Sequence, residues 1–206
     1  KHFSSFLQDG DRYGDMVAWA EKIDSAEYIS VDEAILGDHP ALKINVSLMS
    51  PSSNDDYSRW LVQQLRRLSL AEVAGLDEVR SRYSELRTRL RTSLRRMVGK
   101  VRLYNGVATL DIRAGRNGVI SRYAPYHFFP DAPYSISVVR NPDAIKITAM
   151  RNPWQDFRSV PLGKMFRKFG GGGHERVGAV VVKADDADRV KEIVDSVLGR
   201  LTGISH

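Results

Sequence analysis

The chain has 206 residues, 42% of them hydrophobic, which is enough for one large domain or two small ones with a buried core. It contains no cysteine, which excludes a disulfide framework, a thiolate metal site and a cysteine nucleophile. A formal net charge of +6 favours polyanionic partners without naming one. No apolar run approaches the roughly 20 residues that span a bilayer, and the first residues lack the apolar core of a signal peptide, so we expect a cytoplasmic protein.

Apolar residues at helical spacing predict that the first half of the chain is helical. Ser30 and Glu33 form a capping-box pattern at the start of one helix, and Asn54 or Ser53 is the expected N-cap of another. The predicted helices in this part cover residues 15–23, 31–36 and 54–68.

The clearest helix covers residues 76–97, where apolar residues recur every three or four positions. Its acidic residues lie toward the N-terminus and its arginines crowd the C-terminal half, as the helix dipole favours. The apolar positions are Val79, Tyr83, Leu86, Leu90, Leu94 and Met97.

After this helix the pattern changes to short β-rich runs. Asn105-Gly106 between two such runs is the strongest short hairpin signal that a sequence gives. Asn141-Pro142-Asp143 marks a turn between two further runs. The predicted strands cover 101–104, 107–112, 135–139, 145–149 and 178–183, and a final amphipathic helix covers 187–201.

These elements predict an α/β (α+β) fold with a domain boundary near residue 98. Residues 1–98 form a helical portion that ends in the long helix, which serves as a linker. Residues 99–206 form a compact domain with a mixed β-sheet and flanking helices.

Four consecutive glycines, Gly170 to Gly173, precede His174. Such a run has a large conformational entropy cost, so a compact domain that keeps it needs the missing side chains. Consecutive amides without Cβ atoms can turn their N–H groups toward an anion, and His174 can add a hydrogen bond to the same oxygens. The alternative is a flexible surface loop with an incidental histidine. No Gly-Lys-Ser/Thr follows, so the run is not a P-loop.

The glycine run, followed by His174, Arg176 and Gly178, resembles the Gly-Gly-Gly-His signature of the DHH-associated C-terminal domain of DHH-superfamily phosphoesterases. That family includes single-strand-specific exonucleases, oligoribonucleases that also act on phosphoadenosine phosphate, cyclic dinucleotide phosphodiesterases and prune-type pyrophosphatases. The likeness covers about residues 100–200, because an arginine, a strand and an asparagine that precede the run also match. These are Arg122 in Ser121–Tyr123, the strand Tyr134–Val138, and Asn152 after Arg151.

The resemblance implies a phosphate-binding site around the glycine run, with His174 in a catalytic role. Arg122 and Arg151 are expected on a second phosphate or a terminal group, since the planar fork of arginine can donate two bonds to one phosphate. Asn152 is expected to add a neighbouring hydrogen bond. The implied substrate-binding residues are Arg122, Arg151, Asn152, Gly170, Gly171, Gly172, Gly173, His174 and Arg176.

Asp24 falls at the C-terminal end of its predicted helix, where the dipole disfavours negative charge. A solvated carboxylate is one interpretation. The segment Glu-Lys-Ile-Asp-Ser-Ala around it, however, resembles the Asp-Lys-x-Asp-Ser-Ala stretch of DHH proteins, whose aspartate is the last ligand of a two-manganese centre. Asp24 matches that position, and His2 is placed by the same likeness as the last member of the Asp-His-His triplet.

In that family most metal ligands belong to an N-terminal Rossmann-like half. The resemblance implies hydrolysis of a phosphoester or phosphoanhydride assisted by two Mn²⁺ or Mg²⁺ ions in the complete enzyme. Because one carboxylate cannot hold such a pair, we expect this chain to be a fragment, or the ordered part of a longer protein, that is inactive alone and binds no metal stably. Its expected partners are a phosphate-bearing small substrate or short oligonucleotide, the missing half and, alternatively, a second copy.

Two other functions stay open. In the first, the chain is a nucleic-acid-binding module without catalysis, in which the arginine-rich stretch 87–102 follows a phosphate backbone and Tyr126, Phe128 and Phe129 stack on bases. The alternative interpretation is that the arginines form the solvated face of a helix and the aromatic residues belong to the core. In the second, the chain is an interaction or regulatory remnant that has lost catalysis. Asp24 discriminates against this function, because a degenerate site has no reason to retain a carboxylate at a helix C-terminus. The substrate also stays open among oligoribonucleotide, phosphoadenosine phosphate, cyclic dinucleotide and polyphosphate.

Overall fold

The computed structural model describes residues 10–50, 52–114 and 119–203. They form helices and a six-stranded mixed sheet, which confirms the predicted fold class. The chain divides into two compact units, Lys1–Arg89 and Leu90–His206, so that helix α6 (Asp77–Met97) runs across the division. No helix within the described ranges has the length and apolar character needed to cross a membrane.

The first unit is helical, and the local signals in the sequence account for most of its helix ends. Its helices are α1 (Gly10–Asp24), α2 (Val31–Leu36), α3 (Pro40–Leu48), α4 (Asp55–Leu65), α5 (Leu70–Gly75) and the first part of α6. The sequence did not predict α3 and α5. Their residues Ile44, Val73 and Ala74 pack with Leu61 and Val79 in the core of this unit.

Two predicted helix caps are present. The Oγ atom of Ser30 accepts a hydrogen bond from the Glu33 amide at 3.1 Å, and Asn54, rather than Ser53, caps α4 through Tyr57. The Glu33 carboxylate accepts from the amide of Ile29 at 2.7 Å, one residue before the cap, and forms an ion pair with Lys22 at 2.7 Å. The carboxylate bond of the predicted capping box therefore goes to Ile29 instead of the N-cap Ser30, and the ion pair of Glu33 with Lys22 links the start of α2 to the last turn of α1.

The second unit contains the sheet, in the order β1-β2-β3-β4-β6-β5. All neighbouring strands are antiparallel except β2 and β3, which are parallel. Asn105 and Gly106 both have positive φ values, 45° and 83°, as the predicted tight hairpin requires. The strands are β1 (Val101–Tyr104), β2 (Val107–Arg113), β3 (Tyr134–Arg140), β4 (Ala144–Arg151), β5 (Gly172–His174) and β6 (Val177–Lys183).

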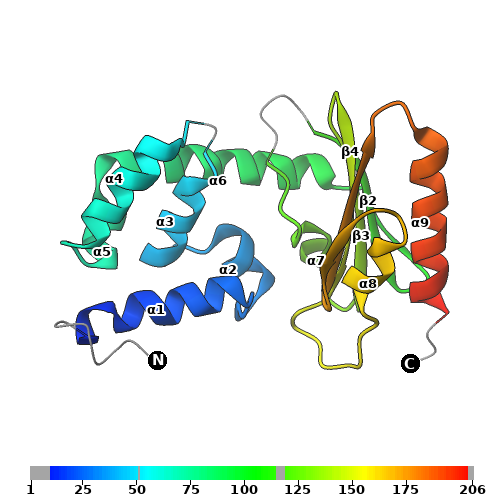
Figure 1. Cartoon of the computed structure of the whole chain (residues 1–206), viewed down its shortest axis with the longest axis horizontal. Helices are drawn as coiled ribbons and strands as arrows, with labels where there is room; N and C mark the ends of the chain where they lie inside the picture. Colours follow the sequence, from blue (N-terminus) through cyan, green and yellow to red (C-terminus); the bar gives the residue numbers. More distant parts are fainter. Residues whose placement is uncertain (1–9, 51, 115–118, 204–206) are drawn as a thin grey trace. The chain divides into compact units, whose positions relative to one another are not determined.

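Helices cover the two faces of this sheet (Figure 1). Helix α9 (Ala187–Thr202) lies along one face, where it contacts β2, β3 and β4 and buries Val190, Ile193 and Val197. The short helix α7 (Ala124–Phe128) lies on the opposite face, and α8 (Leu162–Arg167) packs on β5 and β6. The sequence predicted α9 but not α7, α8 or β5.

Candidate phosphate-binding site

Strand register brings several of the predicted site residues to one end of the sheet. Tyr134, the first residue of β3, faces Arg151, the last residue of β4. Val177 begins β6 opposite Met150, and His174 ends β5 opposite Val177. We call this end of the sheet the hairpin end; it carries Tyr134, Arg151, His174 and Val177.

The first two glycines of the run complete the end of helix α8. Gly170 has a φ of +81°, and its amide donates to the carbonyl of Arg167 at 3.1 Å. The amide of Gly171 donates to the carbonyl of Phe166 at 3.0 Å. Because helix carbonyls already take both N–H groups, the amides of Gly170 and Gly171 are not available to a phosphate. Gly172 and Gly173 pair with β6, and because bonding alternates along an antiparallel strand, only one of these two successive amides points away from β6.

Close backbone packing explains two of the four glycines. A Cβ atom on Gly171 would lie 2.2 Å from the carbonyl oxygen of Ala179, and one on Gly173 would lie 2.2 Å from that of Val177. Gly173 also has a φ of +141°, which side chains disfavour. The missing side chains are therefore needed, as expected, but it is the neighbouring strand β6 that approaches here.

Glycines outside the run bring α8 against the same hairpin. A Cβ atom on Gly163 would lie 2.4 Å from the carbonyl oxygen of Gly173, and one on Gly178 would lie 2.6 Å from that of Leu162. The amide of Leu162 donates to the carbonyl of Glu175 at 3.0 Å. Helix α8 thus fixes the position of the β5–β6 hairpin.

Gly172 is different, because nothing lies within 4 Å of the position that its Cβ would occupy and its φ is not positive. Neither packing nor backbone strain within the described residues requires a glycine at this position. His174 follows two residues later, and its side chain and that of Arg176 are exposed at the tip of the hairpin. The part of this region that a ligand can approach therefore consists of Gly172, the exposed residue Gly173 and the hairpin tip, which carries the His174 imidazole and the Arg176 guanidinium.

Arg151 is the buried cation of the hairpin end, with only 7% of its side chain exposed. Its Nη2 donates to the carbonyl of Phe157 at 2.9 Å, and its guanidinium lies 4.5 Å from the ring of that residue. The carboxylate of Asp156 is 4.0 Å away and fully exposed, so it compensates the charge weakly. The amide of Arg151 donates to the carbonyl of Arg176, which joins this cation to the tip of the hairpin.

Asn152 is fully buried, and its side chain holds backbone in place. Its Nδ2 donates to the carbonyls of Pro130 and Ala132 at 2.7 and 2.9 Å, and its Oδ1 accepts from the amide of Trp154 at 3.0 Å. Both donors of the amide group are used, so it has no hydrogen to offer a phosphate. The predicted direct contact from Asn152 to substrate is therefore replaced by a structural role.

Arg122 reaches the same region through aromatic side chains. Its guanidinium is exposed and donates to the hydroxyl of Tyr123 at 2.8 Å. The Tyr123 ring lies 5.9 Å from that of Trp154, two residues after Asn152. These contacts connect the Arg122 segment to the loop that follows β4.

The aromatic residues that were considered for base stacking include one that cannot perform it. Tyr126 is fully buried, and its hydroxyl donates to the carbonyl of Met150 at 2.6 Å. Burial raises the pKa of Tyr126 above its ordinary value. The stacking interpretation is wrong for Tyr126, while Phe128 and Phe129 are half-buried.

The metal-type residues can be followed only in part. Asp24 is the last residue of α1 and is exposed, as its predicted place at a helix C-terminus implies, whereas His2 lies outside the described residues. Among the residues described, no three histidine, aspartate or glutamate side chains come together as a group able to hold a metal ion. The described residues therefore do not fit a two-metal centre, and no metal-dependent step is assigned to them.

No protein-family model matches the chain, and no curated protein sequence matches it. Solved structures do match. The chain superposes on a pGpG-specific phosphodiesterase, PggH, from Vibrio cholerae with a TM-score of 0.71 and 20% identity, over 91% of this chain and 67% of that one. It also matches the DHH domain of a protein described as a member of the s1p family of ribosomal proteins, with a TM-score of 0.56 and 14% identity, over 97% of this chain and 52% of that one.

These likenesses show that the chain has the fold of DHH-domain proteins, which confirms the resemblance at the level of the fold. The chain spans about two thirds of the phosphodiesterase and about half of the second protein.

Proposed function

We propose that this chain is the substrate-binding part of a phosphoesterase, a hydrolase that cleaves phosphodiester or phosphoanhydride bonds of short nucleotides. The observation that carries the proposal is the open, strain-free position of Gly172 beside the exposed side chains of His174 and Arg176. A glycine there leaves the backbone open to close approach by a ligand.

The charges at the hairpin end support an anionic ligand. Arg151 is buried with an incomplete counter-charge, and Arg176 and Arg122 are exposed. A phosphate offers charge-assisted hydrogen bonds to guanidinium groups and to an imidazole N–H, and these bonds are stronger than those between neutral groups. The site would therefore hold a phosphate by the one amide of 172–173 that points away from β6, by His174 and by the arginines.

In the proposed reaction this chain binds the phosphate and orients it. Divalent Mn²⁺ or Mg²⁺ ions would supply water activation and charge neutralisation when bound. The described residues lack a ligand set for them, so we propose that another part of the complete enzyme provides it and that this chain alone binds substrate without hydrolysing it. A structural neighbour described as pGpG-specific makes a 5′-phosphorylated dinucleotide the first ligand to test.

Isothermal titration of the chain with such a dinucleotide, with and without Mn²⁺, tests the proposal. We expect Gly172→Ala to fold normally and to bind at least about tenfold more weakly, since an added methyl group would displace the ligand. Gly199→Ala is the matched control, because Gly199 also has open space around its Cβ position but lies in α9. Equal affinity of the two variants would refute the proposal.

The side chains can be tested in the same way. His174→Ala and Arg122→Ala are each expected to weaken nucleotide binding, because each removes a donor to phosphate oxygens. Unchanged affinity in both variants would remove these residues from the site.

A further inference from the structure

Helices α3, α5 and α6 enclose a pocket within the first unit. Its volume is about 340 Å³, at the lower end of the range of ligand pockets. Helix α6 contributes Tyr83 and Arg87, four positions apart on one face, and α3 contributes Lys43. Helix α5 contributes a wall that includes Ala71 and Ala74. The pocket is therefore cationic on one side and apolar on another.

The charges that line this pocket are all positive. No carboxylate of the described residues lines it, whereas Lys43, Arg80 and Arg87 do. Asp77 neutralises Arg80 through an ion pair of 2.7 Å. For Lys43 and Arg87, the part of the chain that the structure describes contains no ion pair. Two positive charges in the pocket therefore have no counter-charge.

The ring of Tyr83 holds these two cations close together but compensates them weakly. Nζ of Lys43 lies 5.8 Å from the ring centre and the guanidinium of Arg87 lies 5.7 Å from it, both near the limit of about 6 Å for such contacts. The two charges are therefore at most about 12 Å apart. The Nε atom of Arg87 is buried and has no hydrogen-bond partner among the described residues. An anion bound beside both cations would reduce their mutual repulsion.

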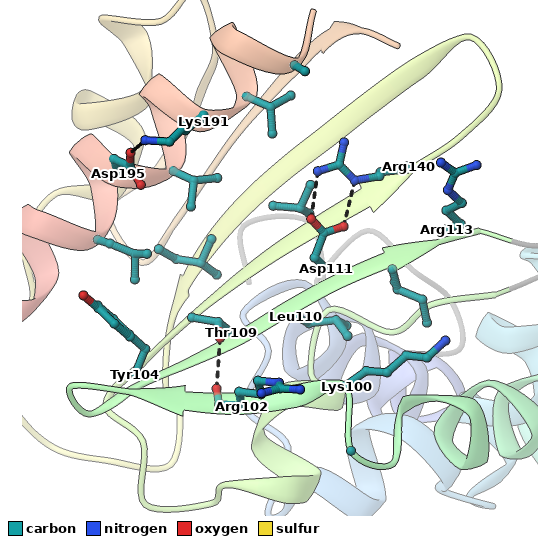
Figure 2. Close-up of a pocket in the computed structure, with 18 of the residues that line it drawn as sticks. Lys100, Arg102, Tyr104, Thr109, Leu110, Asp111, Arg113, Arg140, Lys191 and Asp195 are labelled. Atoms are coloured by element: carbon teal, nitrogen blue, oxygen red, sulfur yellow. Dashed lines mark hydrogen bonds and ion pairs between the residues drawn. The ribbon is translucent and has the colours of Figure 1, made fainter. Parts of the chain in front are cut away.

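A groove of the second unit shows how carboxylates of the chain can balance such cations. In that groove Asp111 accepts two hydrogen bonds of 2.8 Å from the guanidinium of Arg140, and Lys191 donates to Asp195 at 2.6 Å (Figure 2). The pocket of α3, α5 and α6 offers no such partner to its two free cations within the described ranges. A ligand is thus needed to supply the negative charge.

We propose that this pocket binds a small phosphomonoester, with its phosphate between Lys43 and Arg87 and its organic part against Ala71 and Ala74. A phosphomonoester carries close to two negative charges at pH 7, which matches two cations, and its oxygens accept charge-assisted hydrogen bonds. Inorganic phosphate alone would leave the apolar wall uncovered. The pocket belongs to the first unit and the hairpin end to the second, so the inference goes beyond the proposed function and does not rest on it.

Isothermal titration of the whole chain with glycerol 3-phosphate tests the pocket. The double variant Lys43→Gln/Arg87→Gln should bind it at least about tenfold more weakly, because both donors to the phosphate are removed. Inorganic phosphate should bind at least about fivefold more weakly than glycerol 3-phosphate, and glycerol should not bind. Equal binding of inorganic phosphate would overturn the assignment of the apolar wall to an organic part, and no binding of either phosphate would overturn the whole proposal.

The matched control is Arg66→Gln/Arg91→Gln, which removes the same charge from exposed positions that do not line the pocket. The control should bind glycerol 3-phosphate as the unmodified chain does. Equal loss of affinity in the control and the pocket variant would overturn the proposal, because binding would then follow net charge alone.

Nuclear magnetic resonance of the unmodified chain locates the ligand without any substitution and separates this proposal from the proposed function. Glycerol 3-phosphate should shift the amide resonances of Lys43, Gly75 and Ser84, which line the pocket. Shifts confined to the second unit would overturn the proposal, since the phosphate would then bind at the hairpin end. Lys43→Gln/Arg87→Gln should still bind the 5′-phosphorylated dinucleotide, and Gly172→Ala should still show the shifts in the first unit; failure of either would mean that one site accounts for both ligands and would overturn the proposal.

Discussion

The glycine run can be dissected one residue at a time, and its members should respond in opposite ways. In Gly171→Ala the new methyl carbon would lie 2.2 Å from the carbonyl oxygen of Ala179 and 2.8 Å from the Cβ of Val180. Ordinary contact begins near 3.4 Å, so β5 and β6 must move apart by about 1 Å or the end of α8 must shift. Overpacking of this kind costs about 1–3 kcal/mol, and we expect the upper end, about 3 kcal/mol, because backbone rather than a flexible side chain is in the way.

Gly172→Ala should leave stability unchanged or raise it by about 0.5 kcal/mol. Its methyl group meets no atom within 4 Å, and its φ is accessible to alanine. The substitution lowers the conformational entropy of the unfolded chain, which favours the folded state.

Urea denaturation followed by circular dichroism measures both effects on the second unit. The midpoint should fall clearly for Gly171→Ala and stay or rise for Gly172→Ala, with the same dependence on urea concentration. Equal destabilisation of both variants, or a neutral Gly171→Ala, would refute the assignment of packing to one glycine and ligand approach to the next.

Three other substitutions test the surroundings of the site and the helical unit. Asn152→Ala should lower the free energy of unfolding by about 2–4 kcal/mol, because it leaves buried groups without partners, and urea denaturation checks this. Tyr126→Phe should cost about 1–2 kcal/mol through its lost bond to Met150, and a change within error would contradict that role. Burial alone would raise the pKa of Glu33, but the bonds from Lys22 and Ile29 outweigh it and lower the pKa below 4.5. Ionised Glu33 therefore stabilises the fold above pH 4.5, and this stability is lost as pH falls through the lowered pKa. Glu33→Gln should reduce the dependence of the melting temperature on pH between about pH 3 and 6. An unaltered pH profile would contradict the assignment.

The sequence predicts best those elements whose cause is local. Asn105-Gly106 specifies its hairpin because few pairs of residue types adopt positive φ values at two successive positions, and Asn-Gly is one of them. Ser30 and Asn54 mark helix starts because each side chain accepts a hydrogen bond from the amide three residues further on. Such signals need no knowledge of the rest of the fold.

Elements held by distant contacts could not be predicted in this way. Helix α8 is short and strand β5 has a weak intrinsic preference, and glycines at 163, 171, 173 and 178 let the backbones of these separate segments touch. The parallel pairing of β2 and β3 joins segments more than twenty residues apart, and no local pattern marks it. Tertiary packing decides these elements.

The candidate site shows the same division. His174 and the glycine run stand out in the sequence, but a reader of the sequence cannot distinguish glycines required by packing from the one that is not. Asn152 is a polar residue near the site, and only the fold shows that its amide group bonds the carbonyls of Pro130 and Ala132.

The most direct test of the central claim is a calorimetric titration of this chain with a 5′-phosphorylated dinucleotide and with the same dinucleotide without its 5′-phosphate. A phosphate-binding hairpin end predicts that the 5′-phosphorylated ligand binds more tightly than the other ligand and that His174→Ala weakens its binding. Equal binding of the two ligands, or full binding by His174→Ala, would contradict the claim that this part of the fold recognises a terminal phosphate.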